Sequence, residues 1–217
     1  MPSGIDAARF FDSFAGSFDT LYDSKRNRLM QWVDRRFRSD MFLRFALSFE
    51  TVGDLQGRSV LDIGCGSGPY VLEALKRGAS SVTALDPAPN MLALVRSRLE
   101  GAGFSERCSL VQGFFPHPSL NTHDHAIVMG VMDYVADAGA FLAELKPLFR
   151  VSAVISFPSR HWFRSPLRQV RYRMRNCPLY LYREQEVKDL CLRAGYKNVL
   201  VQKIPGAGMD FHVCLKV

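Results

Sequence analysis

A glycine-rich segment and one later aspartate are the residues best suited to chemistry. Residues 62–68 read Asp-Ile-Gly-Cys-Gly-Ser-Gly and follow a short apolar run, and Asp86 ends the next apolar run. Glycines let the backbone turn tightly and approach a ligand without an obstructing side chain. Pro69 suits the first turn of a helix, whose free N–H groups can bind an anionic group. A carboxylate at Asp86 can accept hydrogen bonds from both hydroxyls of a ribose.

Two ligands fit this pattern, a dinucleotide and S-adenosylmethionine. The dinucleotide fingerprint is Gly-x-Gly-x-x-Gly, in which the third glycine allows close helix packing. Pro69 stands at that third position here. Asp62, inside the turn, would repel a pyrophosphate, whereas it can order the loop or accept a hydrogen bond from a ligand ammonium group. The spacing therefore favours S-adenosylmethionine over NAD.

Hydrophobic periodicity predicts the elements that position this loop. Strands are expected at residues 59–63, 81–86, 108–112, 125–130, 152–157, 198–204 and 211–217, and helices at 69–77, 88–100, 138–148 and 184–194. Strands that alternate with helices indicate a mostly parallel sheet covered on both faces. We expect an α/β, Rossmann-like, doubly wound, mostly parallel seven-stranded sheet with a C-terminal antiparallel hairpin strand. In such sheets the ligand lies beyond the carboxyl ends of the strands, where strand order reverses.

The remaining segments suggest a division of the chain. Residues 5–50 show apolar residues at three- and four-residue steps and predict two helical segments. We expect a helical N-terminal cap at residues 1–57 and a sheet domain at 58–217, with a basic insertion on the substrate side at 158–182.

Composition narrows the class of protein. The 217 residues are 47% apolar and 23% charged, which is enough apolar material for a sizeable core. No apolar stretch reaches the length of a spanning helix, and the N-terminus lacks the layout of a secretory signal. The five cysteines contain no Cys-x-x-Cys, which argues against a disulfide framework or a structural zinc site. We expect a reduced, soluble, cytoplasmic protein that binds no metal.

The net charge of +7 is clustered. Six arginines and no acidic residue lie between Arg160 and Arg175, five of them at helical spacing. Three interpretations remain open: a solvated helical face, a basic lid that binds a carboxylate or phosphate of the substrate, or contact with RNA or a membrane surface. DNA is not an expected partner.

The segment Val60-Leu-Asp-Ile-Gly-Cys-Gly-Ser-Gly68 resembles the first motif of class I S-adenosylmethionine-dependent methyltransferases, and Ala84-Leu-Asp86 resembles their second. The resemblance implies that S-adenosylmethionine is bound, with S-adenosylhomocysteine as product. It also implies that the cofactor is contacted by the two motifs, the loops after the third and fourth strands and the cap: Tyr22, Asp62, Gly64, Cys65, Gly66, Gly68, Asp86, Pro87, Met91, Gly113, Phe114, Met129, Gly130 and Val131.

The sequence departs from this family's pattern at two places. Many relatives carry an aspartate after the third strand for the adenine amino group, whereas residues 112–116 here read Gln-Gly-Phe-Phe-Pro. The Asn/Asp-Pro-Pro-Tyr motif of enzymes that methylate amino groups is also missing, because residues 130–134 read Gly-Val-Met-Asp-Tyr. That difference argues against methylation of a planar amide or base nitrogen.

A weaker resemblance concerns three short segments of the chain. Residues 10–22, 155–158 and 179–187 are similar to stretches of magnesium-protoporphyrin O-methyltransferases. That family uses a histidine just after the fourth strand, where this sequence has Asp133 and Tyr134. The similarity implies kinship in architecture and does not name a substrate.

Three residues are candidates for a general base that removes the acceptor's proton: His161, Tyr134 and Asp133. His161 follows the fifth strand and has a suitable pKa range, although it also fits a loop on a basic surface. Asp133 can instead cap the next turn, Tyr22 also fits an apolar helical face, and Cys65 is explained as a small residue that fits the loop.

The sequence thus predicts methyl transfer to a small molecule, with oxygen the favoured acceptor atom and an acidic or amphipathic substrate. The alternatives are an RNA or protein methyltransferase and a non-catalytic protein that binds S-adenosylmethionine.

Overall fold

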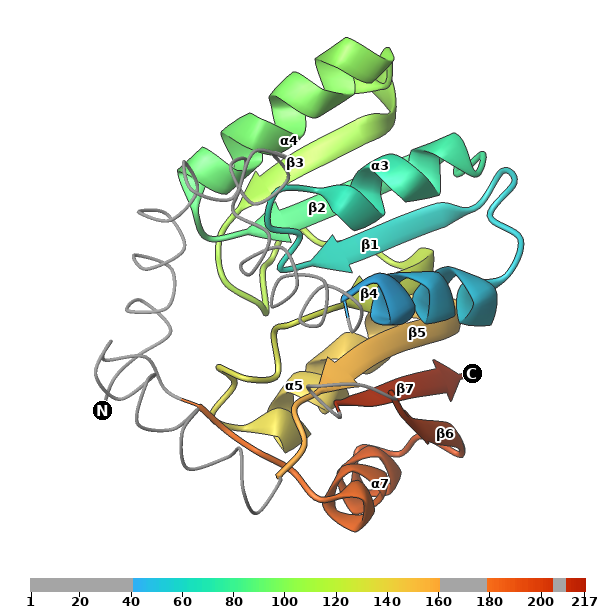
Figure 1. The fold of residues 1–217 in the computed structure, drawn as a ribbon, viewed down its shortest axis with the longest axis vertical. Coiled ribbons are helices and arrows are strands. Elements are labelled where there is room, and N and C mark those ends of the chain that lie inside the picture. Colours follow the sequence, from blue (N-terminus) through green and yellow to red (C-terminus); the bar gives the residue numbers. More distant parts are fainter. Residues whose placement is uncertain (1–40, 161–178, 205–209) are drawn as a thin grey trace, which may run out of the picture.

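The computed structural model describes residues 41–160, 179–204 and 210–217 (Figure 1). A helix occupies residues 41–52. The strands are β1 (Ser59–Ile63), β2 (Ser81–Asp86), β3 (Cys108–Gln112), β4 (His123–Val128), β5 (Phe149–Phe157), β6 (Asn198–Lys203) and β7 (Phe211–Lys216). The longer helices between them are α3 (Pro69–Lys76), α4 (Pro89–Ala102), α5 (Ala138–Leu145) and α7 (Glu184–Arg193). Short 3-10 turns lie at Ser105–Arg107 and Lys146–Leu148.

The strands form one seven-stranded sheet in the order β3-β2-β1-β4-β5-β7-β6. β1 pairs in parallel with both β2 and β4, so the chain order reverses beside β1. β7 runs antiparallel to both of its neighbours, β5 and β6. The expected α/β sheet, mostly parallel with an antiparallel strand near its C-terminus, is confirmed.

Alternation along the strands divides the core between the two faces of the sheet. On one face, helix 41–52, α3 and α4 cover a cluster that includes Phe49, Val60, Val71, Leu75, Val82 and Val95. On the other face, α5 and α7 cover a cluster that includes Leu61, Ile63, Phe141, Leu142, Val187 and Val213. Even-numbered residues of β1 and β5 face helix 41–52, and odd-numbered ones face α5 and α7. Figure 1 shows helix 41–52, in blue, crossing in front of β4 and β5.

Several observed bounds differ from the expected ones. β4 begins at His123, two residues early, because the Asp124 backbone N donates to Ser59 Oγ at 2.9 Å while Ser59 N donates to Asp124 Oδ2 at 2.8 Å. β4 ends at Val128 because Gly130 takes a φ of +74°, which is not an extended conformation. The expected helix at 138–148 ends its α-helical part at Leu145 and finishes as a 3-10 turn.

The described end of the expected cap packs against the sheet domain. Phe49 is 1% exposed and stacks on Tyr70 of α3 with ring centroids 5.9 Å apart. Leu55 is equally buried and belongs to the same cluster as Val60 of β1. Residues 41–57 therefore contribute to the core of the sheet domain, and a boundary at residue 57 stays a prediction.

We expect Phe49→Ala to lower the free energy of unfolding by about 3–5 kcal/mol, because it empties a fully buried ring site. Urea denaturation measures this loss. Phe42→Ala on the same helix is the matched control, since Phe42 is 64% exposed and its removal should change stability by only a few tenths of a kcal/mol. Equal effects of the two substitutions would contradict the packing of this helix on the sheet.

Candidate functional site

The glycine loop turns sharply between β1 and α3. The backbone N–H groups of Gly64 and Cys65 both donate to the Leu85 carbonyl oxygen, at 2.8 and 3.1 Å. Gly64, Gly66 and Gly68 all have positive φ, between +53° and +80°. The loop is therefore fixed to the end of β2, and it opens α3 at the carboxyl edge of the sheet.

The three glycines serve different purposes. A Cβ at Gly64 would overlap Val131 Cγ2, and a Cβ at Gly68 would lie 2.9 Å from Val95 Cγ2. A Cβ at Gly66 would meet nothing within 4 Å. Gly64 and Gly68 thus permit close packing within the protein, whereas Gly66 presents its backbone to open space.

Asp86 orders both the glycine loop and the start of α4. Its Oδ2 accepts a hydrogen bond from the Gly66 backbone N at 2.8 Å, and its Oδ1 accepts one from the Ala88 backbone N at 2.9 Å. The side chain is 7% exposed. A carboxylate has about four acceptor positions, so it can accept from backbone N–H groups and from ligand hydroxyls together. The ribose contact of Asp86 stays a prediction.

Asp62 is buried beneath the loop. It is 1% exposed, and its Oδ2 has no hydrogen-bond partner in the described part of the chain. Burial, and then the negative charge of Asp86, raise the pKa of Asp62 to about 8. The Asp62 carboxyl group is therefore protonated at neutral pH in this structure.

Cys65 has no features of a reactive thiol. It is 4% exposed, and burial followed by the charges of Asp62 and Asp86 raises its pKa well above the ordinary value. Since the thiolate is the nucleophilic form, the interpretation of Cys65 as a small residue that fits the loop agrees with its surroundings.

The segment after β3 closes beside Asp86. Gly113 N donates to the Asp86 carbonyl oxygen at 3.2 Å, and a Cβ at Gly113 would lie 2.6 Å from His117 Cδ2. The Phe114 side chain is 46% exposed, whereas Met91 is 2% exposed and packs with Ala88. The structure thus brings the loops after β1, β2 and β3 together, as expected for one ligand. Pro87 lies at the same place, between Asp86 and Ala88.

The segment after β4 carries two of the candidate bases. Asp133 is 7% exposed, and its carbonyl oxygen accepts a hydrogen bond from Tyr180 N at 2.9 Å. Tyr134 N donates to the Val131 carbonyl oxygen at 2.9 Å, which closes a turn directly after Gly130. Tyr182 lies against the same turn, with its hydroxyl 3.5 Å from the Met132 carbonyl oxygen.

Tyr182 also ties this turn to the end of β5. Tyr182 N donates to the Pro158 carbonyl oxygen, and Arg160 N donates to the Tyr182 carbonyl oxygen, at 2.9 and 2.8 Å. Burial, then the charge of Asp133, raises the pKa of Tyr182 to about 12, so this phenol keeps its proton at neutral pH. His161 and Tyr22, and the basic segment after Arg160, lie outside the described residues.

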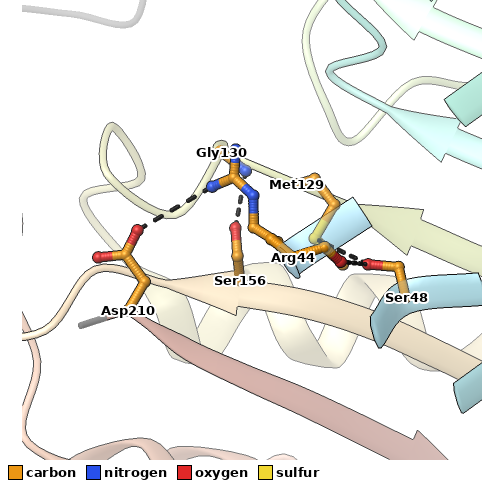
Figure 2. A network of polar contacts seen from close by, with 6 residues as sticks. All are labelled: Arg44, Ser48, Met129, Gly130, Ser156 and Asp210. Carbon is orange, nitrogen blue, oxygen red and sulfur yellow. Dashed lines mark hydrogen bonds and ion pairs between the residues drawn. The ribbon is translucent and has the colours of Figure 1, made fainter. Parts of the chain in front are cut away.

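Sequence reasoning missed a polar network beside Met129 and Gly130 (Figure 2). Ser156 Oγ of β5 accepts a hydrogen bond from Gly130 N at 2.8 Å, and Ser48 Oγ of helix 41–52 lies 3.7 Å from Met129 Sδ. Arg44 reaches from the same helix to Asp210, with Nη1 4.0 Å from Oδ2. The sequence signal that could have indicated this network is the presence of polar residues, such as Ser156 and His212, on otherwise apolar strands.

Neither a metal site nor a membrane-spanning helix is found in the described part of the chain. Among those residues, no group of three or more His, Cys, Asp or Glu side chains is arranged to hold a metal ion. None of the described helices combines the length and apolar character needed to cross a bilayer.

Comparison with known proteins identifies the class of this site. Residues 60–151, which run from β1 into β5, match the family model described as a methyltransferase domain. The chain contains a methyltransferase domain. The glycine loop and Asp86 lie within it, as the resemblance to class I S-adenosylmethionine-dependent methyltransferases implied.

Individual relatives agree on this methyltransferase domain and differ in substrate. The chain is 33% identical to the tRNA U34 carboxymethyltransferase of Idiomarina loihiensis over 122 residues, which cover 55% of this chain and 37% of that protein. It is 28% identical to the ubiquinone biosynthesis O-methyltransferase of a Bradyrhizobium strain over 123 residues, which cover 55% of this chain and 47% of that protein. The matched part is thus less than half the length of either relative.

A solved structure matches almost the whole chain. Magnesium protoporphyrin IX methyltransferase from Synechocystis PCC 6803, crystallised with bound SAH, superposes with a TM-score of 0.74. The match covers 97% of this chain and 98% of that one at 16% identity, and it shows a shared fold.

We expect Asp62→Asn to stabilise the protein increasingly as the pH rises. The folded-state pKa of Asp62, about 8, lies above its ordinary value of 3.8, so the native state holds a proton that the unfolded chain releases. Native stability is therefore lost between about pH 4 and pH 8 as pH increases. Urea denaturation at pH 5 and pH 8.5 measures the free energy of unfolding of both proteins. Between these two pH values the difference between variant and wild type should grow in favour of the variant by a few kcal/mol, the order expected for a pKa shift of this size.

Asp124→Asn is the matched control for that measurement. Hydrogen bonds from Ser59 lower the pKa of Asp124, so this group is ionised in both states throughout pH 5–8.5. Its effect on stability should therefore be constant over that range. A constant difference for Asp62→Asn as well would mean that Asp62 is ionised in the folded protein.

Proposed function

We propose that this chain is an S-adenosylmethionine-dependent methyltransferase that methylates an oxygen atom of a small acidic or amphipathic molecule. The observation that carries the proposal is the joining of Gly66 to Asp86 at the point where strand order reverses. There the Gly66 backbone, whose Cβ position is unobstructed, lies beside the Asp86 carboxylate and close to the start of α3, within the residues that match the methyltransferase domain.

The cofactor roles follow from these positions. The Gly66 backbone lines the methionine part of the cofactor, and Asp86 binds the ribose hydroxyls through its carboxylate oxygens. Pro87 and Met91, with Gly113 and Phe114, flank the adenine. Gly64, Gly68 and Cys65 maintain the loop from behind, and Met129, Gly130 and Val131 lie beneath the sulfonium.

Methyl transfer is an in-line displacement at the sulfonium carbon, so the protein mainly aligns donor and acceptor and excludes water. In this proposal Asp133 and Tyr134, which belong to the turn at 130–134, face the acceptor. Either residue, or His161 after β5, removes the proton from a hydroxyl acceptor whose pKa is high. A carboxylate acceptor, by contrast, needs no base because it is already ionised at neutral pH.

The oxygen acceptor is supported by one name among the similar proteins, an O-methyltransferase of ubiquinone biosynthesis. A second candidate, modification of RNA, is favoured by the similarity to the tRNA carboxymethyltransferase and by the six arginines between Arg160 and Arg175. Turnover stimulated by bulk tRNA, with binding that weakens steeply as salt rises, would select this second candidate.

Calorimetric titration with S-adenosylhomocysteine, with NAD as the control, is the first test of this proposal. We expect a dissociation constant in the micromolar range, on the order of −8 kcal/mol, and no heat of binding from NAD. Binding of NAD in place of the adenosyl ligand would overturn the cofactor assignment. The absence of both signals would overturn the proposed function.

We expect Gly66→Ala to abolish detectable S-adenosylhomocysteine binding while the protein remains folded. The new Cβ extends into the open space over the loop, where the ligand would lie, and the positive φ costs about 1–2 kcal/mol of stability. Calorimetry and thermal unfolding together measure both effects.

Gly103→Ala provides the matched control for this substitution. Gly103 also has a positive φ, +73°, and open space at its Cβ position, but it lies at the far end of α4. It should lose similar stability and keep full affinity. Equal loss of affinity in both variants would mean that strain, and not steric exclusion of the ligand, explains the Gly66 result.

A further inference from the structure

Arg44 occupies a position between the glycine loop and the far half of the sheet. It lies on helix 41–52, and its Nη1 is 4.0 Å from Asp210 Oδ2, just before β7 (Figure 2). Arg44 also interacts with Tyr70, in the first turn of α3. Burial raises the pKa of Tyr70, and the charge of Arg44 together with hydrogen bonds from Ser48 and Arg44 partly offsets that rise. The guanidinium is thus placed among the carboxyl ends of the central strands.

The surroundings of Arg44 leave its donors incompletely used. Its Nε is buried and has no hydrogen-bond partner among the described residues. The 4.0 Å separation from Asp210 is longer than the 2.7–2.9 Å typical of charge-assisted hydrogen bonds. Because a buried donor without an acceptor is destabilising, this geometry favours the arrival of another acceptor.

The other polar side chains near Arg44, those of Ser156 and His212, carry no positive charge that could attract an anion. Ser156 of β5 is paired in register with His212 of β7, on the sheet face covered by helix 41–52. His212 is 1% exposed, and its Nε2 has no hydrogen-bond partner in the described ranges. Burial, then the charge of Arg44, lowers the pKa of His212 to about 4, so the imidazole is neutral at neutral pH. Arg44 is the cation of this cluster.

We propose that Arg44 binds a carboxylate group of the methyl acceptor. The inference rests on the proposed function, because it takes the space beside Gly130 to be the acceptor's place. The flat guanidinium holds a carboxylate through two parallel N–H donors, and the Arg44 side chain is 20% exposed, so a ligand can reach it. One guanidinium, with the Asp210 carboxylate beside it, suits a monoanionic carboxylate better than a dianionic phosphate.

The test uses the full chain with benzoate as the probe carboxylate and benzamide as its uncharged counterpart. The ¹⁵N–¹H signal of Arg44 Nε, assigned by its loss in Arg44→Gln, is followed during titration of the protein saturated with S-adenosylhomocysteine. We expect a saturable shift with benzoate and binding at least about tenfold weaker for benzamide, a difference of about 1.4 kcal/mol. Equal shifts with both compounds, or none with benzoate, would overturn the proposal.

Two further variants separate recognition from a structural role. Asp210→Asn removes the competing carboxylate and should tighten benzoate binding several-fold, a gain that a merely structural ion pair would not give. Arg193→Gln removes the same charge from the exposed end of α7 and should leave benzoate binding unchanged. A loss of affinity in Asp210→Asn, or in Arg193→Gln, would also count against the site.

The result can be told apart from failure of the proposed function. If S-adenosylhomocysteine binds and benzoate leaves the Arg44 signal unmoved, the carboxylate site fails alone. If S-adenosylhomocysteine does not bind while benzoate shifts the Arg44 signal in the unliganded protein, the proposed function fails and the anion site stands.

Discussion

The hydrogen bond between the Asp86 carboxylate and the Gly66 backbone N is the contact on which this site depends. It joins the loop after β1 to the end of β2, while the other carboxylate oxygen holds Ala88 at the start of α4. A charged acceptor makes such bonds stronger than those between neutral groups. Because Gly66 has no side chain, the same contact fixes the loop and leaves its outer surface open to a ligand.

The raised pKa of Asp62 is a consequence of placing two carboxyl groups, those of Asp62 and Asp86, close to the same loop. It lies under the loop without a hydrogen-bond partner for Oδ2 among the described residues, and ionisation beside Asp86 is unfavourable there. A cation brought close to Asp62 would lower its pKa again, because an opposite charge favours the ionised form. Cofactor uptake and release of a proton from Asp62 are therefore coupled if the cofactor's ammonium group lies close to that carboxyl.

The fold, and the meeting of the glycine loop with Asp86, could be predicted because their sequence signals are local. Residues 59–68 combine a strand, a glycine turn and a helix start in ten consecutive positions, and Asp86 ends the next strand. The separate roles of the three glycines could not be predicted. Gly64 and Gly68 are needed because Val131 and Val95, which are distant in sequence, lie close to them. The end of β4 was misplaced for the same reason, because Gly130 is fixed by Ser156 of a later strand.

The proposed acceptor side of the site is assembled from segments that sequence alone does not bring together. Helix 41–52, the turn after β4, the end of β5 and residues 179–183 meet there, joined by contacts such as Tyr180 N with the Asp133 carbonyl oxygen. The clustered arginines directed attention to residues 160–175. The cation that we propose for substrate binding is instead Arg44, a single charge between the apolar residues Leu43 and Phe45 of helix 41–52. Counting charges along the sequence draws attention to clusters of arginines. Recognition of one carboxylate, by contrast, needs a single guanidinium that is partly buried and has a donor without a partner. Only the folded structure shows which arginine combines these properties.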